Sequence, residues 1–160
     1  MTQTILTHLK ALTAFSGREP RGEFWPYVGL VIAASMIAMV LITVIFILSA
    51  NDPLESDIAW VIALSIAVIA LLAAAVARRL HDRGLSGVWG LLPLPFLAFG
   101  FFQMHREFLA FGAGEPDTAF DTVSASVLLY DISLIVLIIL LVGRSNEGAN
   151  RFGPNPRDAR

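Results

Sequence analysis

Residues 58–77 read IAWVIALSIAVIALLAAAVA, an apolar stretch of 20 residues without a charge, and Arg78 and Arg79 follow it at once. A helix that crosses the hydrocarbon core of a membrane needs about 20 predominantly apolar residues. Arginine and lysine gather at the cytoplasmic ends of such helices. The stretch therefore predicts a transmembrane helix whose carboxyl end lies at the cytoplasmic surface.

Three further apolar runs extend this pattern, at residues 26–50, 88–104 and 122–143. The run at 88–104 has only 17 residues with Pro93 and Pro95 near its start, so a buried hairpin half that does not cross is an alternative there. We favour four crossings because the charge pattern requires an even number. The sequence thus predicts an all-α integral membrane protein, a four-transmembrane-helix bundle that forms one membrane domain over residues 1–160.

Lysine and arginine are divided unequally among the segments that flank and connect the four runs. Ten of the 11 lie before the first run, between the second and third, or after the fourth, and Arg106 alone lies elsewhere. By the positive-inside rule these three segments are cytoplasmic, which places both termini inside the cell. The formal net charge of −2 hides this asymmetry and is uninformative about partners.

Composition argues against several other classes of protein. The chain is 56% hydrophobic and 15% charged, with a mean hydropathy of +0.73, well to the apolar side of soluble domains. It has no cysteine, and its three histidines lack the spacing of metal ligands. Neither a nucleophile elbow nor a phosphate-binding glycine loop is present, and the basic residues do not form a nucleic-acid-binding module. We therefore expect no enzymatic activity, cofactor, metal or nucleic-acid partner.

The first 12 residues carry a short amphipathic pattern. Ile5, Leu6, Leu9 and Leu12 recur at helical spacing, with polar residues opposite. This pattern predicts a short N-terminal interfacial helix on the inner membrane surface. An irregular tail with a chance periodicity is the alternative.

Small residues repeat four apart along the run at 58–77. The pairs are Ala63 with Ala67, Ala70 with Ala74, and Ala73 with Ala77. Small side chains let a neighbouring helix backbone approach closely. This face is either an internal seam of the bundle or a homodimer face.

Three predicted cytoplasmic segments combine arginine, glycine and aromatic residues beside a membrane span: GREPRGEFW at 17–25, RRLHDRGLSGVW at 78–89 and GANRFGPNP at 148–156. Through these segments the chain resembles the domain of unknown function 805 family of small bacterial inner-membrane proteins. The resemblance covers nearly the whole chain. The resemblance implies a small multi-span protein of the bacterial inner (plasma) membrane with no assigned activity. The signature positions that it implies are Arg18, Arg21, Phe24, Trp25, Arg78, Arg79, His81, Asp82, Gly84, Ser86, Gly87, Trp89, Asn150, Gly153 and Pro156.

The arginines of these segments have two interpretations. In the first they are topology signals that form internal ion pairs with Asp82 and Glu23, beside a tight turn at Gly84 and Gly87. In the second, surplus positive charge binds an anion, either an anionic lipid headgroup or an acidic protein partner. The candidate binding residues are Arg18, Arg21, Arg78, Arg79, Arg83 and Arg151.

Asp131 is the one charge inside a predicted span, and it departs from the apolar run that the family resemblance implies. An ionised carboxylate costs roughly 2.5–3.5 kcal/mol at the centre of a membrane helix. Asp131 therefore either forms a hydrogen bond to another helix or belongs to a proton- or cation-linked transport site. Transport by a small homo-oligomer is the alternative to lipid or partner binding.

Overall fold

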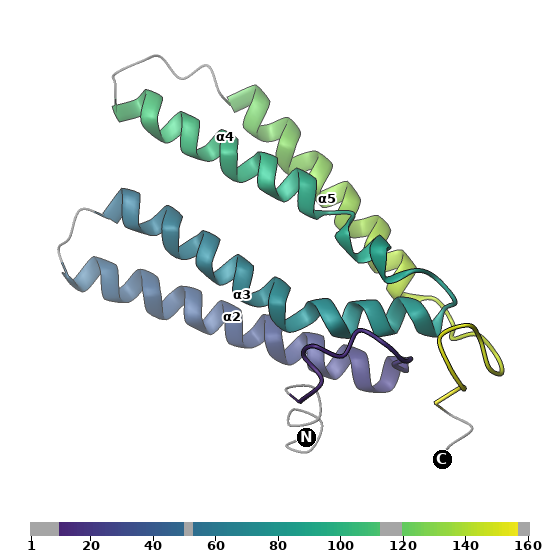
Figure 1. Cartoon of the computed structure of the whole chain (residues 1–160). Helices are drawn as coiled ribbons and strands as arrows, with labels where there is room; N and C mark the ends of the chain where they lie inside the picture. The colour runs from purple at the N-terminus through teal and green to yellow at the C-terminus, as the bar shows by residue number, and fades with distance from the viewer. Residues whose placement is uncertain (1–9, 50–52, 113–119, 157–160) are drawn as a thin grey trace. The chain divides into compact units, whose positions relative to one another are not determined.

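The computed structural model describes residues 10–49, 53–112 and 120–156, and all of its regular elements are helical (Figure 1). They are α2 (Arg21–Ser49), α3 (Pro53–Asp82), the 3₁₀ helix η1 (Gly87–Leu91), α4 (Leu94–Gly112) and α5 (Phe120–Val142). Within the described residues there is no β-strand, only an isolated bridge between Asn150 and Gly153. The predicted all-α class is confirmed. The predicted N-terminal interfacial helix falls mainly on residues 1–9, which lie outside the described residues.

Four helical segments are long and apolar enough to cross a membrane, as the sequence predicts: Arg21–Ile45, Ala59–Asp82, Gly87–Glu107 and Ala125–Val142. Large apolar side chains are exposed along them, for example Met36 and Ile37 on α2 and Ile139 on α5. Such extensive apolar exposure suits a lipid environment and not water. The chain is therefore a multi-pass membrane protein.

Helix ends differ from the predicted spans at several points. Helix α2 begins at Arg21, not at residue 26, because the Pro20 carbonyl accepts the N–H groups of Glu23 and Phe24, each at 3.1 Å. Helix α3 continues past Ala77 to Asp82, where Arg78 and Asp82 form tertiary ion pairs with Glu19 and Arg18.

The third apolar run is divided at its prolines. η1 precedes Pro93, and α4 begins at Leu94, where the Pro93 carbonyl accepts the Leu97 N–H at 3.0 Å. Proline has no N–H to donate, so it suits the start of a helix better than its interior. Helix α4 then continues to Gly112, into the segment that the sequence leaves as a connection.

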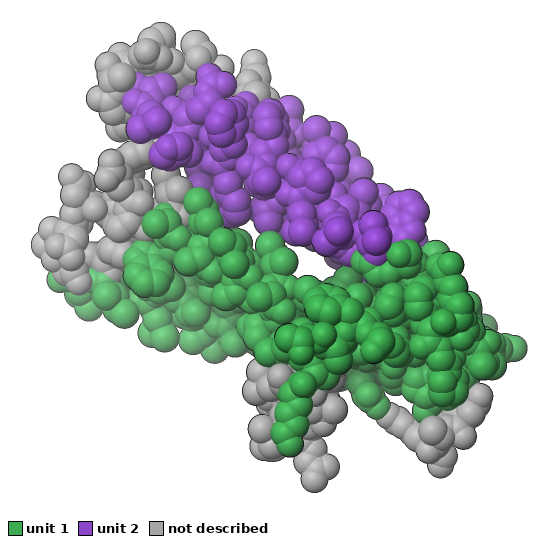
Figure 2. Space-filling model, viewed as in Figure 1, with its two compact units in different colours: residues 1–87, 144–160 green, residues 88–143 purple. Residues whose placement is uncertain are grey.

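The chain forms two compact units (Figure 2). Unit 1 comprises residues 1–87 and 144–160, and unit 2 comprises residues 88–143. Helix α2 packs against α3 in unit 1, and α4 packs against α5 in unit 2. The prediction of a single membrane domain stays a prediction.

The α2–α3 pair buries its apolar side chains mainly near the carboxyl end of α3. Phe24 and Tyr27 on α2 and Ala74, Ala77 and Leu80 on α3 are all buried. The other half of the predicted alanine seam is exposed, at positions 63, 67 and 70. The close-packed part of unit 1 therefore lies next to the arginine-rich segments.

Candidate functional site

The carboxyl end of α3 is closed by a Schellman motif. The Leu85 N–H donates to the Leu80 carbonyl at 3.0 Å, and the Gly84 N–H donates to the His81 carbonyl at 2.9 Å. Gly84 has φ +74°, the left-handed conformation that this motif requires and that glycine adopts at little cost. The helix therefore ends at a fixed point, and its last side chains are held in fixed directions.

Segments from both ends of the chain bond to the last carbonyls of α3. The Glu19 N–H donates to the Arg78 carbonyl at 3.2 Å, and the Asn146 N–H donates to the Asp82 carbonyl at 3.0 Å. The Asn150 side-chain amide donates to the His81 carbonyl at 2.9 Å. His81 and Asp82 belong to the last turn of α3, whose carbonyls have no i+4 donor within the helix, so both terminal segments add hydrogen bonds at this end of α3.

Asp82 is the centre of the site. Its side chain is fully buried, and its two oxygens accept from different arginines. Arg18 Nε donates to Oδ1 at 3.1 Å, and Arg79 Nη1 donates to Oδ2. The side chains of both arginines are almost completely buried as well. One carboxylate thus joins the N-terminal segment to α3 inside a buried ion-pair triad.

Arg18 also binds the C-terminal segment through its remaining donors. Nη2 donates to the Asn146 carbonyl at 2.7 Å, and Nη1 donates to the Gly148 carbonyl at 2.6 Å and the Gly153 carbonyl at 3.5 Å. A guanidinium has five N–H donors in a rigid plane, so one side chain can serve acceptors from several segments. Arg18 therefore holds the N-terminal segment, α3 and residues 146–153 together.

Arg78 organises the residues that precede α2. Its Nε and Nη2 lie 2.9 Å and 2.8 Å from Glu19 Oε2, and its Nη1 donates to the carbonyls of Ala11 and Ala14 at 2.9 Å and 2.6 Å. Asp82 and Glu23 are the partners predicted from the sequence, whereas Arg78 pairs with Glu19. We call Arg18, Arg78, Arg79, Glu19 and Asp82 the arginine cluster.

A short C-terminal turn packs on His81. The Phe152 ring stacks on the His81 ring with centroids 3.8 Å apart and planes 7° apart. The turn is closed by paired backbone bonds between Asn150 and Gly153, and the Asn150 side chain accepts the Phe152 N–H. His81 Nδ1 lies 3.2 Å from the Gly17 carbonyl and donates to it. His81 is thereby held between the N-terminal and C-terminal segments.

The structure brings most of the sequence-predicted residues together in unit 1. Arg18, Arg78, Arg79, His81, Asp82, Asn150 and Gly153 belong to the contacts described above. Arg21 is the first residue of α2, Arg83 follows α3, and the Trp25 ring contacts the Phe24 ring edge-on at 5.1 Å. Trp89 is exposed on η1 and belongs to unit 2. The sequence does not predict four further residues of the site, because their partners lie at least 59 residues away in the chain. These residues are Glu19, Asn146, Gly148 and Phe152.

Asp131 lies on α5 in unit 2 and is exposed. The neighbouring Ser133 is buried, and its hydroxyl donates to the Tyr130 carbonyl at 2.6 Å. Asp131 is therefore not part of the arginine cluster, and its predicted role in transport stays a prediction.

Gly87 is expected to tolerate no larger side chain. A Cβ atom there would lie 2.9 Å from the Ala77 Cβ and 3.4 Å from its Cα. We expect Gly87→Ala to lower the free energy of unfolding by about 1–3 kcal/mol, the usual cost of overpacking. Thermal unfolding in detergent measures this loss. Gly22→Ala is the matched control, because a Cβ at Gly22 meets no atom within 4 Å, and an equal effect of the two substitutions would contradict the prediction.

A family model described as "Protein of unknown function (DUF805)" matches residues 12–154, which include the whole arginine cluster. No curated protein and no solved structure matches the chain.

Proposed function

The chain belongs to the DUF805 family, whose description assigns no activity. From this premise we propose a non-enzymatic role, in which a cationic face of unit 1 binds anionic lipid headgroups. The membrane proposed is the bacterial inner membrane, with both termini and this face on the cytoplasmic side. The proposal rests on the positive-inside distribution of arginine and on the charge balance around the end of α3.

Positive charge exceeds negative charge at this end of unit 1. The described residues 10–23, 78–87 and 144–156 contain eight lysines and arginines against four acids, a net charge of +4. Clusters of four to eight such cations beside a transmembrane helix are typical of binding to anionic lipids. This surplus is the observation that carries the proposal.

The cations divide into a buried group and an exposed group. The side chains of Arg18 and Arg79 are buried and donate to internal acceptors, so they support the fold. Lys10, Arg144 and Arg151 are exposed. Arg151 is also oriented, since its guanidinium lies 4.6 Å from the centroid of the Phe152 ring and donates to the Gly84 carbonyl at 3.4 Å. The exposed group is the proposed contact with lipid phosphate, and the arginine cluster is the scaffold that positions it.

Binding to phosphatidylglycerol tests the proposal. Each cation near an anionic surface contributes ~1 kcal/mol, so replacing Lys10, Arg144 and Arg151 together by glutamine is expected to weaken binding by about two orders of magnitude. Native mass spectrometry with added phosphatidylglycerol or phosphatidylcholine measures the retained lipid. Added salt should also weaken the interaction, since it screens exposed charges.

The chain offers a control on its predicted outer side. Arg106 is exposed on α4, and Arg106→Gln removes a positive charge without touching the proposed face. We expect this variant to retain phosphatidylglycerol as the wild type does. Equal retention of anionic and zwitterionic lipid by the wild type would contradict the proposal. A partner protein retained in place of lipid would favour the alternative occupant of the same face.

A further inference from the structure

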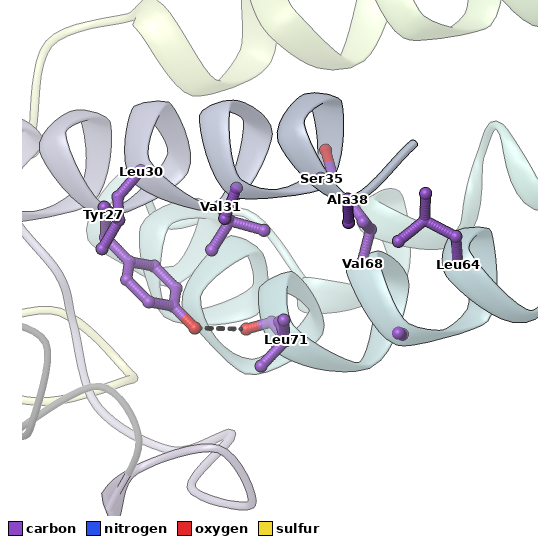
Figure 3. Close-up of a pocket in the computed structure, with 10 residues that line it drawn as sticks. Tyr27, Leu30, Val31, Ser35, Ala38, Leu64, Val68 and Leu71 are labelled. Carbon is purple, nitrogen blue, oxygen red and sulfur yellow. Dashed lines mark hydrogen bonds between the residues drawn. The ribbon is translucent and has the colours of Figure 1, made fainter. Parts of the chain in front are cut away.

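A narrow groove runs between α2 and α3 inside unit 1 (Figure 3). Its volume is about 290 Å³. Tyr27, Val31, Ala34 and Ala38 line it from α2, and Ala67 and Leu71 line it from α3. Both helices are long and apolar enough to cross a membrane, and in that placement the groove lies at hydrocarbon depth.

The groove presents almost only aliphatic surface. Its two hydroxyl groups are already used within the protein: Tyr27 Oη donates to the Leu71 carbonyl at 2.9 Å, and Ser35 Oγ donates to the Ile32 carbonyl at 2.8 Å (Figure 3). A polar ligand would find no unused hydroxyl donor there and would lose its hydration. The chemistry of the lining therefore suits a hydrocarbon chain.

The length of the groove matches one leaflet of a bilayer. The 12 residues from Tyr27 to Ala38 on α2 rise by about 16 Å at ~1.5 Å per step, half of the ~30 Å hydrocarbon core. Tyr27 forms the end nearer the cationic face, six residues beyond Arg21. The groove therefore occupies the leaflet whose headgroups adjoin that face.

The size of the groove decides between a lipid chain and a helix. A volume of about 290 Å³ over a length of about 16 Å is far less than a whole helix of that length occupies. A helix with its side chains measures ~10–12 Å, whereas neighbouring carbon atoms pack at ~3.5–4.0 Å. The space therefore admits a single aliphatic chain more readily than a helix.

We propose that this groove holds one acyl chain of the anionic phospholipid whose headgroup binds the cationic face. The inference rests on the proposed function and adds where the lipid tail lies. The headgroup site supplies selectivity for charge, and the groove fixes the position of the lipid against α2 and α3.

Photolabelling tests this placement in the full-length protein. The probe is phosphatidylglycerol with a diazirine in one acyl chain, added to phosphatidylcholine vesicles that contain the protein. We expect labelling concentrated on residues 27–38 and 64–71, and unlabelled phosphatidylglycerol should reduce it more than added phosphatidylcholine does. Labelling spread evenly over all four membrane helices would overturn the placement.

Substitutions from the two walls of the groove give an independent test. Ala34→Leu on α2 and Ala67→Leu on α3 each fill the groove, and each is expected to reduce this labelling about tenfold, a change equivalent to ~1.4 kcal/mol. Ala33→Leu and Ala63→Leu are the matched controls, because both positions are exposed on the same helices and outside the lining. Circular dichroism confirms that each variant remains helical.

The outcomes separate this inference from the proposed function. If the wild type prefers phosphatidylglycerol but Ala34→Leu and Ala67→Leu label like their controls, the groove is not the acyl site and the headgroup proposal stands. If the wild type has no preference for phosphatidylglycerol, both proposals fail. The chain has no cysteine, so Ala38→Cys introduces a single thiol, and its ready formation of a disulfide-linked dimer in vesicles would assign the groove to a second copy.

Discussion

Replacement of Asp82 by alanine is expected to lower the free energy of unfolding of unit 1 by about 3–5 kcal/mol, the usual cost of removing one partner from a buried ion pair. The Asp82 carboxylate is the shared acceptor of Arg18 and Arg79, and all three side chains are buried. Without it, two guanidinium groups would stay out of water and lose their counter-charge. Thermal or denaturant unfolding in detergent, followed by circular dichroism, measures the loss.

Two further variants sharpen this experiment. Glu147→Ala removes an exposed carboxylate from the same unit and is expected to change stability by no more than about 0.5 kcal/mol. Asp82→Asn keeps the shape of the side chain and one acceptor oxygen. Its loss of unfolding free energy should therefore fall between those of Asp82→Ala and Glu147→Ala. Equal unfolding midpoints for Asp82→Ala and Glu147→Ala would show that the buried triad does not stabilise the fold.

Replacement of Arg18 by alanine is expected to release the C-terminal segment from α3. Arg18 donates to the carbonyls of Asn146, Gly148 and Gly153 in addition to Asp82, and hydrogen bonds to charged groups are worth about 1.5–3 kcal/mol each. If the C-terminal segment loses only ~1.4 kcal/mol of binding free energy, the fraction of molecules in which it is detached from α3 increases tenfold. We therefore expect trypsin to cleave after Arg151 at least about ten times faster than in the wild type, because proteolysis follows the population of the opened form.

Arg144→Ala is the matched control for this effect, since it removes an exposed arginine from the same unit. Arg18→Lys keeps the charge but not the planar array of donors, so cleavage should still be faster than in the wild type. If Arg18→Ala leaves the cleavage rate after Arg151 unchanged, the C-terminal segment is held by other contacts, such as the stacking of Phe152 on His81.

The ends of the helices could be predicted only in part. Hydropathy gives four spans, and the structure has four helical segments suited to crossing a membrane. Hydropathy also ends the second span at Ala77, whereas α3 continues through Arg78, Arg79 and Asp82. Charged residues end an apolar run without ending a helix. The helix ends instead at the Schellman motif formed by Gly84, a residue that the sequence predicts to lie in a turn.

The candidate site could be predicted as a set of residues but not as a set of contacts. The arginine-rich segments, with Asp82, His81 and Asn150, are recognisable in the sequence by composition and by resemblance to the family. Arg78 pairs with Glu19 rather than with Glu23, and Arg18 bonds to main-chain carbonyls of residues 146–153. Every residue has a main-chain carbonyl, so the sequence alone does not indicate which carbonyls will accept hydrogen bonds from an arginine.

The sequence by itself therefore determined the all-α class, the four membrane-crossing helices and the concentration of cations at the ends of the spans. These are local properties, since about 20 apolar residues cross a membrane whatever lies elsewhere in the chain. Only the tertiary structure decided that Arg18, Arg78 and Arg79 are largely taken up by internal bonds, leaving Lys10, Arg144 and Arg151 exposed. Arg79 pairs with Asp82 three residues along α3, but the partners of Arg18 and Arg78 are 59 or more residues away in the chain and come within about 3 Å of them only after α3 and both terminal segments have packed.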